Sequence, residues 1–397
     1  MPRWLLPESI ADVLPSEARQ IEDLRRRLLD IYRTYGYELL IPPLIEHLDS
    51  LLTGSGSDLG SRTFQLVDQL SGRTLGVRAD MTTQVARIDA HLLNRQGVAR
   101  FCYAGSVLHT LPQSGLAKRE LFQIGGEVYG HAGLEADLEA LELVVESIVA
   151  AQAKPETIIL DLCHYGIVPA LVEGSARFSA QRDAIYTALV QKDAPSLTTL
   201  GFDNLAKLST CYGDVQEVLK KARSFFTGLP AVELALVELE RLVKSPLWAR
   251  YPNVRLALDL ADLRGYGYHT GVAFAAYVAS FPNALARGGR YDSIGKSFGR
   301  SRPATGFSLE LRDLIQLQNL AAQRETLSAT AIRAPWSDSG PLLAEISRLR
   351  RLGEIVVQVL PGHEHDPQEF SCDRELQLKQ NSEADTLACW HVVNIIQ

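Results

Sequence analysis

Four polar side chains of this 397-residue sequence have the chemistry to hold the charged ends of a small molecule. Gln123 and Glu127 stand four residues apart in a β-rich run, so both project from one side of a strand. Asp80 carries a carboxylate, which, like that of Glu127, would attract an ammonium group. Arg264 carries a planar guanidinium that can meet a carboxylate in a fork geometry. These residue types therefore suit a ligand that carries both an ammonium and a carboxylate group.

Each of these residues also has a plainer explanation. Asp80 precedes a predicted helix and could cap its N-terminus, which would use one oxygen and leave the charge available for a ligand. Gln123 and Glu127 could be surface residues of a strand, and Arg264 could brace a turn. The run His363-Glu364-His365-Asp366 resembles a metal cluster, but it lies in a polar loop, so we predict neither a metal site nor a cofactor.

Composition narrows the class of protein. The chain has 40 Lys and Arg against 47 Asp and Glu, a net charge of −7, which weakens a role in binding nucleic acid. No run of about 18 apolar residues predicts a membrane span, and the N-terminus lacks a signal-peptide core. The five cysteines contain no CxxC pair, which fits a reduced, cytoplasmic chain without zinc. They are Cys102, Cys163, Cys211, Cys372 and Cys389.

The elements that must position these residues form a recognisable order. Apolar residues at spacings of three and four predict a helix over residues 16–35, with Ser16 as a cap and Gly36 at its end. Two β-rich runs flank a polar loop and predict a long hairpin over residues 99–109 and 121–129. Further strands are predicted at 37–41, 74–78, 157–163, 254–260, 271–279 and 285–287, and further helices at 81–94, after 134, and from about 309.

Runs of strands with helices grouped between them favour an α+β fold. Residues 167–250 are helical in pattern, so we predict a helical insertion in a core of residues 1–320. Small and polar residues at 321–328 indicate a linker. Beyond it, residues 329–397 predict a small α/β domain that contains a strand, a helix and a strand, with another strand at 386–396.

Three segments resemble the class II histidyl-tRNA synthetase family. They are residues 74–82 (TLGVRADMT), residues 105–130 with the run FQIGGEVY, and residues 263–271 (LRGYGYHTG) followed by GGRYD at 288–292. The resemblance covers about residues 8 to 318 and implies the antiparallel sheet core of that fold. It also implies a two-fold dimer through residues 36–51.

The resemblance assigns roles to residues of this sequence. Asp80 and Thr82 match positions that hold the α-amino group of the amino acid, and Gln123 and Glu127 match positions that contact it. Tyr268 and His269 match the pair that encloses the imidazole, although Tyr268 could equally be core packing. With Arg264 as the partner of the carboxylate, the resemblance implies a site for free histidine.

The sequence departs from the synthetase family at the positions that would bind the nucleotide. His109 stands where the family has an arginine on the second motif, and Asp313 stands where an arginine contacts adenine and phosphate. A charge-assisted contact of about 1.5–3 kcal/mol would be replaced by repulsion at Asp313. Arg312 is a neighbouring helical position that points about 100° away. The tail is also shorter than an anticodon-binding domain and is acidic from 366 to 385.

Together these features resemble the regulatory subunit family of ATP phosphoribosyltransferase. The resemblance implies a non-catalytic partner of a short catalytic subunit in the first step of histidine biosynthesis, with feedback by histidine and no tRNA. Two alternatives stay open, a divergent histidyl-tRNA synthetase and a stand-alone histidine-activating ligase.

Overall fold

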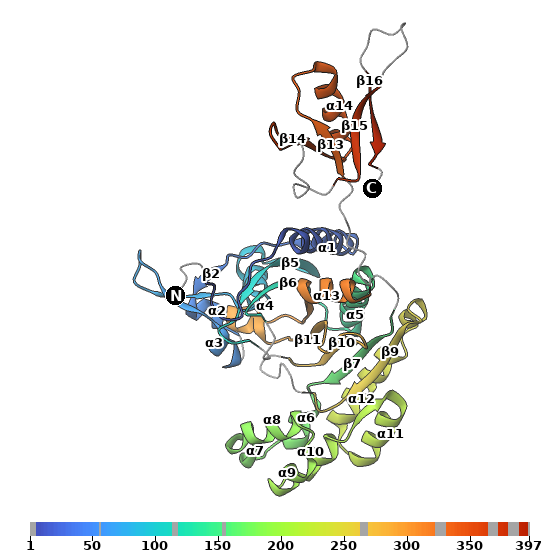
Figure 1. Cartoon of the computed structure of the whole chain (residues 1–397). Helices are drawn as coiled ribbons and strands as arrows, with labels where there is room; N and C mark the ends of the chain where they lie inside the picture. The colour runs from blue at the N-terminus through green and yellow to red at the C-terminus, as the bar shows by residue number, and fades with distance from the viewer. Residues whose placement is uncertain are drawn as a thin grey trace. The chain divides into compact units, whose positions relative to one another are not determined.

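The computed structural model describes residues 5–54, 57–112, 118–152, 156–262, 269–321, 331–363, 372–379 and 389–395. The chain forms two compact units, residues 1–323 and 324–397 (Figure 1). Among the described residues, no helix is long and apolar enough to cross a membrane. No group of three metal-ligating side chains occurs within the same ranges, and residues 364–366 of the metal-like run lie outside them.

A nine-stranded sheet is the centre of the first unit. Its strands, in spatial order, are β1 (Glu38–Leu39), β5 (Ala99–Leu108), β6 (Glu120–Tyr129), β12 (Ala304–Glu310), β11 (Ala286–Arg290), β10 (Val272–Val278), β7 (Ile158–His164), β9 (Val254–Asp259) and β8 (Tyr212–Asp214). Neighbours are antiparallel except for β1–β5 and β7–β9, which are parallel. The α+β fold with a largely antiparallel core is confirmed, and the two parallel pairs make the sheet mixed.

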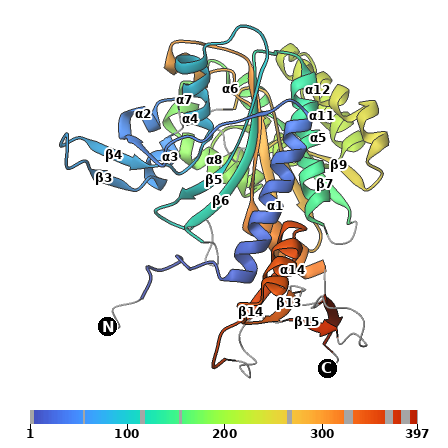
Figure 2. The same cartoon turned by 90° about the horizontal axis from the view of Figure 1, so that it is seen from above.

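Long amphipathic helices cover one face of this sheet. They are α1 (Pro15–Thr34), α5 (Leu134–Ala151) and α13 (Leu311–Ala321), which contact one another. Figure 2 shows α1 and α5 side by side along the sheet. Their apolar stripes meet in one core, where the hydroxyls of Tyr32 and Ser147 share a 2.8 Å hydrogen bond. The predicted cap at Ser16 is wrong, because Pro15 already occupies the first turn, and the helix is followed by Gly36 at a φ of +83°.

The opposite face of the sheet carries short elements and a second core. These elements are α4 (Thr82–Arg87), which continues into the π-helix η1 (Ile88–Leu93), and the 3₁₀ helix η3 (Ile294–Phe298). A separate sheet is formed by β2 (Ile45–His47), β4 (Thr74–Val77) and β3 (Gln65–Val67), with α2 (Leu48–Leu52) and α3 (Ser57–Arg62) nearby in the chain. Met81, Val85, Phe101, Tyr103 and Tyr291 fill the second core.

The predicted helical stretch between β7 and β9 is helical apart from β8 at the sheet edge. It contains α6 (Ile167–Val172), α7 (Ala176–Ala180), α8 (Arg182–Val190), α9 (Ala194–Thr199), α10 (Asp203–Leu208), α11 (Val215–Phe225), α12 (Pro230–Val243) and the 3₁₀ helix η2 (Pro246–Arg250). Because β7 and β9 are parallel, the helices serve as the crossover between them.

The second unit is a four-stranded sheet with one helix. Its elements are β13 (Ala331–Pro335), α14 (Gly340–Arg351), β14 (Ile355–Val359), β15 (Arg374–Lys379) and β16 (Cys389–Asn394), in the sheet order β14-β13-β15-β16. Leu342, Ile346 and Leu349 of the helix pack on Ile332 of the sheet in a small core. The sequence did not predict β15, because its residues lie in the acidic, polar stretch.

Candidate functional site

The Glu127 carboxylate is the centre of a hydroxyl cluster buried beneath the second face of the sheet. Its side chain comes from β6, and the residue is 1% exposed. The hydroxyl of Thr82, in the first turn of α4, donates to Oε1 at 3.1 Å. The hydroxyl of Tyr103, from β5, donates to the same oxygen at 3.0 Å, and that of Tyr291 donates to Oε2. Three separate segments therefore converge on the carboxylate that β6 carries.

Two glycines leave room for this cluster. Gly306 on β12 pairs with Glu127, and a Cβ there would overlap Oε2 of that carboxylate. Gly125 pairs with Tyr103, and a Cβ at Gly125 would lie 2.7 Å from the tyrosine hydroxyl. Both glycines are needed for space, because a side chain would occupy the position of the acid or the phenol.

Burial dominates the electrostatics of the cluster. Burial and, to a smaller extent, the nearby Asp80 carboxylate raise the pKa of Glu127, the hydroxyls of Tyr291, Tyr103 and Thr82 oppose the rise, and the resulting pKa is about 8. Burial and the negative charge of Glu127 raise the pKa values of Tyr103 and Tyr291 well above the ordinary value for a phenol. Both phenols therefore stay protonated and remain hydrogen-bond donors.

Asp80 and Gln123 form a second hydrogen-bonded pair at the start of α4. The amide nitrogen of Gln123 donates to Oδ1 of Asp80 at 2.7 Å. The backbone N–H of Met81 lies between them, 2.8 Å from Asp80 Oδ1 and 3.1 Å from Gln123 Oε1. The predicted N-cap at Asp80 is wrong in position, since Met81 occupies the cap. The carboxylate still accepts an N–H at the entrance to the helix.

His269 lies near the end of the resembling segment 263–271, next to Tyr165 and to Gly289 of β11. Its ring lies 5.0 Å from the ring of Tyr165, centroid to centroid, at a tilt of 34°. On β11, a Cβ at Gly289 would lie 2.9 Å from Cδ2 of His269. The next residue, Thr270, donates its backbone N–H to the carbonyl of Arg290 at 2.8 Å. Arg264 and Tyr268 lie outside the described residues, so their predicted roles stay predictions.

His109 and Asp313, which stand where the synthetase family has nucleotide-binding arginines, offer no guanidinium to a phosphate. His109 is buried and donates Nε2–H to the carbonyl of Ala79 at 2.9 Å. Asp313 lies in the first turn of α13, where burial raises its pKa to about 6. Arg312 is 3% exposed and lies over the ring of Phe122, 5.0 Å from the guanidinium carbon to the centroid. Its guanidinium donates to the backbone carbonyls of residues 11 and 120.

Comparison with known proteins identifies the family. Residues 9–314 match the histidyl-tRNA synthetase family, and residues 329–384 match the "ATP phosphoribosyltransferase subunit HisZ C-terminal domain". A curated relative from Burkholderia multivorans is 54% identical over 383 residues, which cover 95% of this chain and 97% of that protein. A relative from Bordetella avium is 53% identical over 393 residues, covering 96% and 98%. Both carry the name ATP phosphoribosyltransferase regulatory subunit.

The chain belongs to the family of ATP phosphoribosyltransferase regulatory subunits. The resemblance to this family is therefore confirmed. Two solved structures share the fold. One is described as an ATP phosphoribosyltransferase regulatory subunit/histidyl-tRNA synthetase from Bacillus halodurans, with a TM-score of 0.79 and 24% identity over 92% of this chain and 95% of that one. The other is a histidyl-tRNA synthetase from a Nostoc species, with a TM-score of 0.75 and 20% identity over 94% and 91%.

Sequence reasoning missed three residues that build the site of this regulatory-subunit chain. Tyr291 belongs to the run GGRYD, whereas Tyr103 lies two residues before the second resembling segment. Tyr103 is a buried phenol on the strand face shared with Glu127, and Tyr291 reaches the same carboxylate from the residue after β11. Gly306 belongs to β12, a strand that the sequence did not predict because Gly306 and Ser308 interrupt its apolar pattern. The role of Gly306 in the site can be recognised only once its pairing with Glu127 is known.

Arg290 of the same motif has a structural role. Its guanidinium donates to Oδ2 of Asp137 at 2.6 Å and to the carbonyls of His131 and Gly133 at 3.2 and 2.9 Å. The ion pair is buried, with the arginine side chain 8% exposed and the aspartate side chain fully covered. Arg290 therefore holds the N-terminal end of α5 against β11, while the next residue, Tyr291, extends to Glu127.

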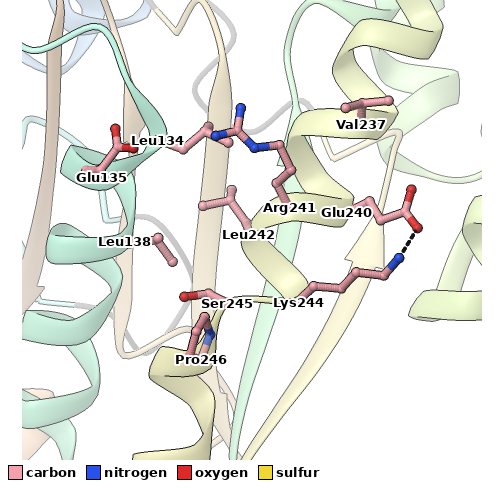
Figure 3. A pocket seen from close by; sticks show the side chains of 10 residues that line it. All are labelled: Leu134, Glu135, Leu138, Val237, Glu240, Arg241, Leu242, Lys244, Ser245 and Pro246. Carbon is pink, nitrogen blue, oxygen red and sulfur yellow. Dashed lines mark hydrogen bonds and ion pairs between the residues drawn. The ribbon is translucent and has the colours of Figure 1, made fainter.

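Two cavities of the regulatory-subunit chain lie away from Glu127. A cavity of about 500 Å³ opens between α5 and α12, where Leu138, Val237 and Leu242 face charged residues that include Arg241 and Glu240 (Figure 3). A second, of about 320 Å³, lies on β7, β8, β9 and β10 beside Asp161 and Tyr212. Neither cavity is lined by Asp80, Gln123 or Glu127, so the hydroxyl cluster and the cavities are separate features.

Proposed function

We propose that this chain is the regulatory partner of a separate catalytic ATP phosphoribosyltransferase subunit in a cytoplasmic complex, and that the Glu127 cluster is its sensor for free histidine. The complex would perform the first step of histidine biosynthesis. One observation carries the assignment of the sensor: a buried carboxylate surrounded by three hydroxyl donors, with the Asp80–Gln123 pair bonded to the first turn of the same helix.

The chemistry of histidine suits these groups. Its α-ammonium group needs an acidic partner, which Asp80 and Glu127 can supply. Its α-carboxylate needs a cation, and we assign this role to Arg264. Its imidazole needs a polar contact between flat side chains, which Glu127, Tyr268 and His269 would provide. The contact between the rings of His269 and Tyr165 supports this, because it holds one ring of the enclosure in place.

Histidine must favour one quaternary state over another, since a ligand with equal affinity for both states cannot regulate. A coupling of about 1–3 kcal/mol is typical of such regulation. The proposal is tested by copurifying the chain with the short catalytic subunit and measuring activity across a histidine titration. We expect co-elution and inhibition by histidine. Separate elution of the two proteins would contradict the proposed partnership.

The Arg264→Ala variant should raise the histidine concentration needed for half-inhibition about tenfold, because one charge-assisted contact to the ligand carboxylate is lost. Assembly with the catalytic subunit should be unchanged. Arg255→Ala, at an exposed position of β9, is the matched control. Equal inhibition of the Arg264 variant and wild type would place the sensor elsewhere, on the partner or at the interface between the proteins.

We expect no histidine-dependent adenylation. His109 and Asp313 replace two cations that would clamp the nucleotide, and Arg312 is engaged with the N-terminal segment. An adenylating site needs preorganised positive charge, and losing such groups costs several orders of magnitude in rate. The measurement is ATP–pyrophosphate exchange with histidine. Exchange at synthetase-like rates would favour one of the two alternatives, a divergent synthetase or a histidine-activating ligase.

A dimer through residues 36–51 is the second part of the proposed assembly. The segment leads from β1, a two-residue strand at the sheet edge, into β2. Ile41 is 83% exposed, and Leu70, in the turn between β3 and β4, is 97% exposed. Further apolar residues between positions 39 and 67 are also exposed, and exposed apolar surface that forms one patch would mark an interaction surface. They are Leu39, Leu44, Ile45, Leu66 and Val67.

The Ile41→Asp variant should convert this dimer into a monomer at micromolar concentration, because an unpaired charge would be buried at a two-fold contact and appear twice. The fold of the monomer should survive, since the side chain touches solvent there. Leu234→Asp, at a 68% exposed position of α12, is the control. Light scattering checks the outcome, and a wild-type protein of monomeric mass would contradict the dimer itself.

A further inference from the structure

The larger cavity, of about 500 Å³ between α5 and α12, has an apolar base. Leu134 and Leu242 are buried in one small apolar cluster, and Leu138 packs against them. Val237, on α12, forms a further apolar wall and is 39% exposed, so solvent reaches the cavity on this side. Cavities of about 300–1,000 Å³ with an apolar lining and a few polar groups are typical of small-molecule sites. This cavity therefore has the size and lining that the apolar body of a ligand requires.

Arg241 supplies a positive charge at the edge of the cavity. It lies on α12, one helical turn after Val237, and is exposed. Figure 3 shows its side chain extending from α12 toward Leu134 of α5. Within the parts of the chain that the structure describes, its guanidinium makes no hydrogen bond and has no acidic oxygen within 4.0 Å. The guanidinium can therefore receive an anionic group that enters beside the apolar base.

The other charged residues of the lining already have partners. Glu240 pairs with Lys244 at 2.6 Å and with Arg223 at 2.7 Å. Glu135 pairs with Nε2 of His131 at 2.9 Å. Each carboxylate beside the cavity is thus bonded to a cation or to an imidazole, and the charge that stays unpaired is positive.

Two carboxylates influence Arg241 from farther away, but neither bonds to it. Hydrogen bonds from His131 and His164 are the largest causes that lower the pKa values of Glu135 and Glu238, and Arg241 adds only a smaller effect. Those bonds measure 2.9 and 3.0 Å. A guanidinium has five N–H donors in a planar arrangement that matches a carboxylate in two parallel hydrogen bonds. A ligand carboxylate would therefore find a complementary group at this edge.

We propose that this cavity binds a small organic anion whose apolar body lies between α5 and α12 and whose terminal carboxylate pairs with Arg241. The bound anion would contact both helices and hold α12, part of the crossover, against α5 of the core. Histidine does not match this lining, because its ammonium group and its imidazole would face apolar side chains. The site is separate from the Glu127 cluster, and the proposal does not depend on the histidine sensor.

Titration calorimetry of the full-length chain at pH 7.5 tests the site with two probes of equal shape. The first is 4-phenylbutyrate, which carries a carboxylate, and the second is 4-phenylbutanamide, which has the same body without the charge. We expect saturable binding of one molecule of the acid per chain. The amide should bind about tenfold more weakly, because it forms no charge-assisted pair with the guanidinium. Raising the salt concentration should weaken only the binding of the acid.

Variants assign the two halves of the ligand to their partners. Arg241→Gln should bind the acid as weakly as wild type binds the amide, with no change for the amide itself. Val237→Glu should abolish the binding of both probes, because it places a charge on the apolar wall, and circular dichroism checks that this partly exposed position tolerates the change. Arg255→Gln, at an exposed position of β9, is the matched control and should bind both probes as wild type does.

Three outcomes would overturn the proposal. The first is the absence of saturable binding of the acid by wild type at millimolar concentration. The second is equal affinity of wild type for the acid and the amide, which would show that the site recognises no charge. The third is equal weakening of acid binding in the Arg241 and Arg255 variants, which would show attraction to positive surface charge in general. Histidine titrations of the same variants should match wild type, which keeps this test independent of the proposed sensor.

Discussion

Gly306→Ala should abolish histidine binding to this chain, with affinity falling at least about a hundredfold, the equivalent of about 2.7 kcal/mol. The new methyl group would overlap Oε2 of Glu127 and lie 2.8 Å from the carbonyl oxygen of Gly126. The carboxylate must then leave its position beneath Tyr291, and the sheet must open between β6 and β12. Calorimetry with histidine measures the loss, and thermal unfolding measures the strain.

Two further variants separate the clash from a general effect of a methyl group. Gly340→Ala is the control, because a Cβ there meets no atom within 4 Å. In Glu127→Ala with Gly306→Ala, the overlap with the acid is gone, so part of the lost thermal stability should return while histidine binding stays absent. Affinity within threefold of wild type for Gly306→Ala would show that the ligand does not use the Glu127 carboxylate.

Arg290→Met should destabilise the first unit by about 3–5 kcal/mol, because it leaves the fully buried Asp137 without its cation. Burial already raises the pKa of that aspartate, and the arginine opposes the rise. In the variant, the pKa should rise further, so the deficit in stability should grow as the pH increases from 5 to 8. Urea unfolding at two pH values, followed by tryptophan fluorescence, measures both effects.

Arg287→Met is the matched control for this ion pair. Arg287 is exposed on the same strand, and its replacement should change the free energy of unfolding by no more than about 0.5 kcal/mol. Combining Arg290→Met with Asp137→Leu should recover much of the loss, since two apolar side chains replace an isolated buried charge. A single Arg290 variant as stable as wild type would contradict the structural role that we assign to this arginine.

The sequence predicted those residues of the site whose relative positions are fixed within a single strand. The alternation of a strand places Gln123 and Glu127 on one face, and β6 presents both toward α4. The hairpin of β5 and β6 also followed from local pattern, because both strands are long and their register is continuous. The resemblance located Asp80 and Thr82, and both lie at the start of α4, where each bonds to a residue of β6.

What could not be predicted depends on pairings between distant segments. Gly306 matters because it has no side chain, and this leaves space for the carboxylate of Glu127, its pairing partner on β6. The sequence alone does not reveal that pairing. Arg290 and Tyr291 are neighbours, yet one holds α5 and the other bonds to Glu127, because successive residues here face opposite ways. The strands β12 and β15 were missed for a related reason: Gly, Ser and charged residues give them weak strand propensity, and the sheets on either side supply the stability.

The long sequence separation between Glu127 and Tyr291 also affects how the chain folds while it is being synthesised. Tyr291 comes 164 positions after Glu127. The Glu310 carboxylate, which accepts the N–H of Phe122, comes 188 positions after Phe122. The β5–β6 hairpin therefore leaves the ribosome long before β12, and until then the edge of β6 has unpaired backbone groups beside a polar carboxyl. Folding of this sheet is dominated by late, long-range closure, the regime in which nascent chains are slow to fold and rely most on chaperones.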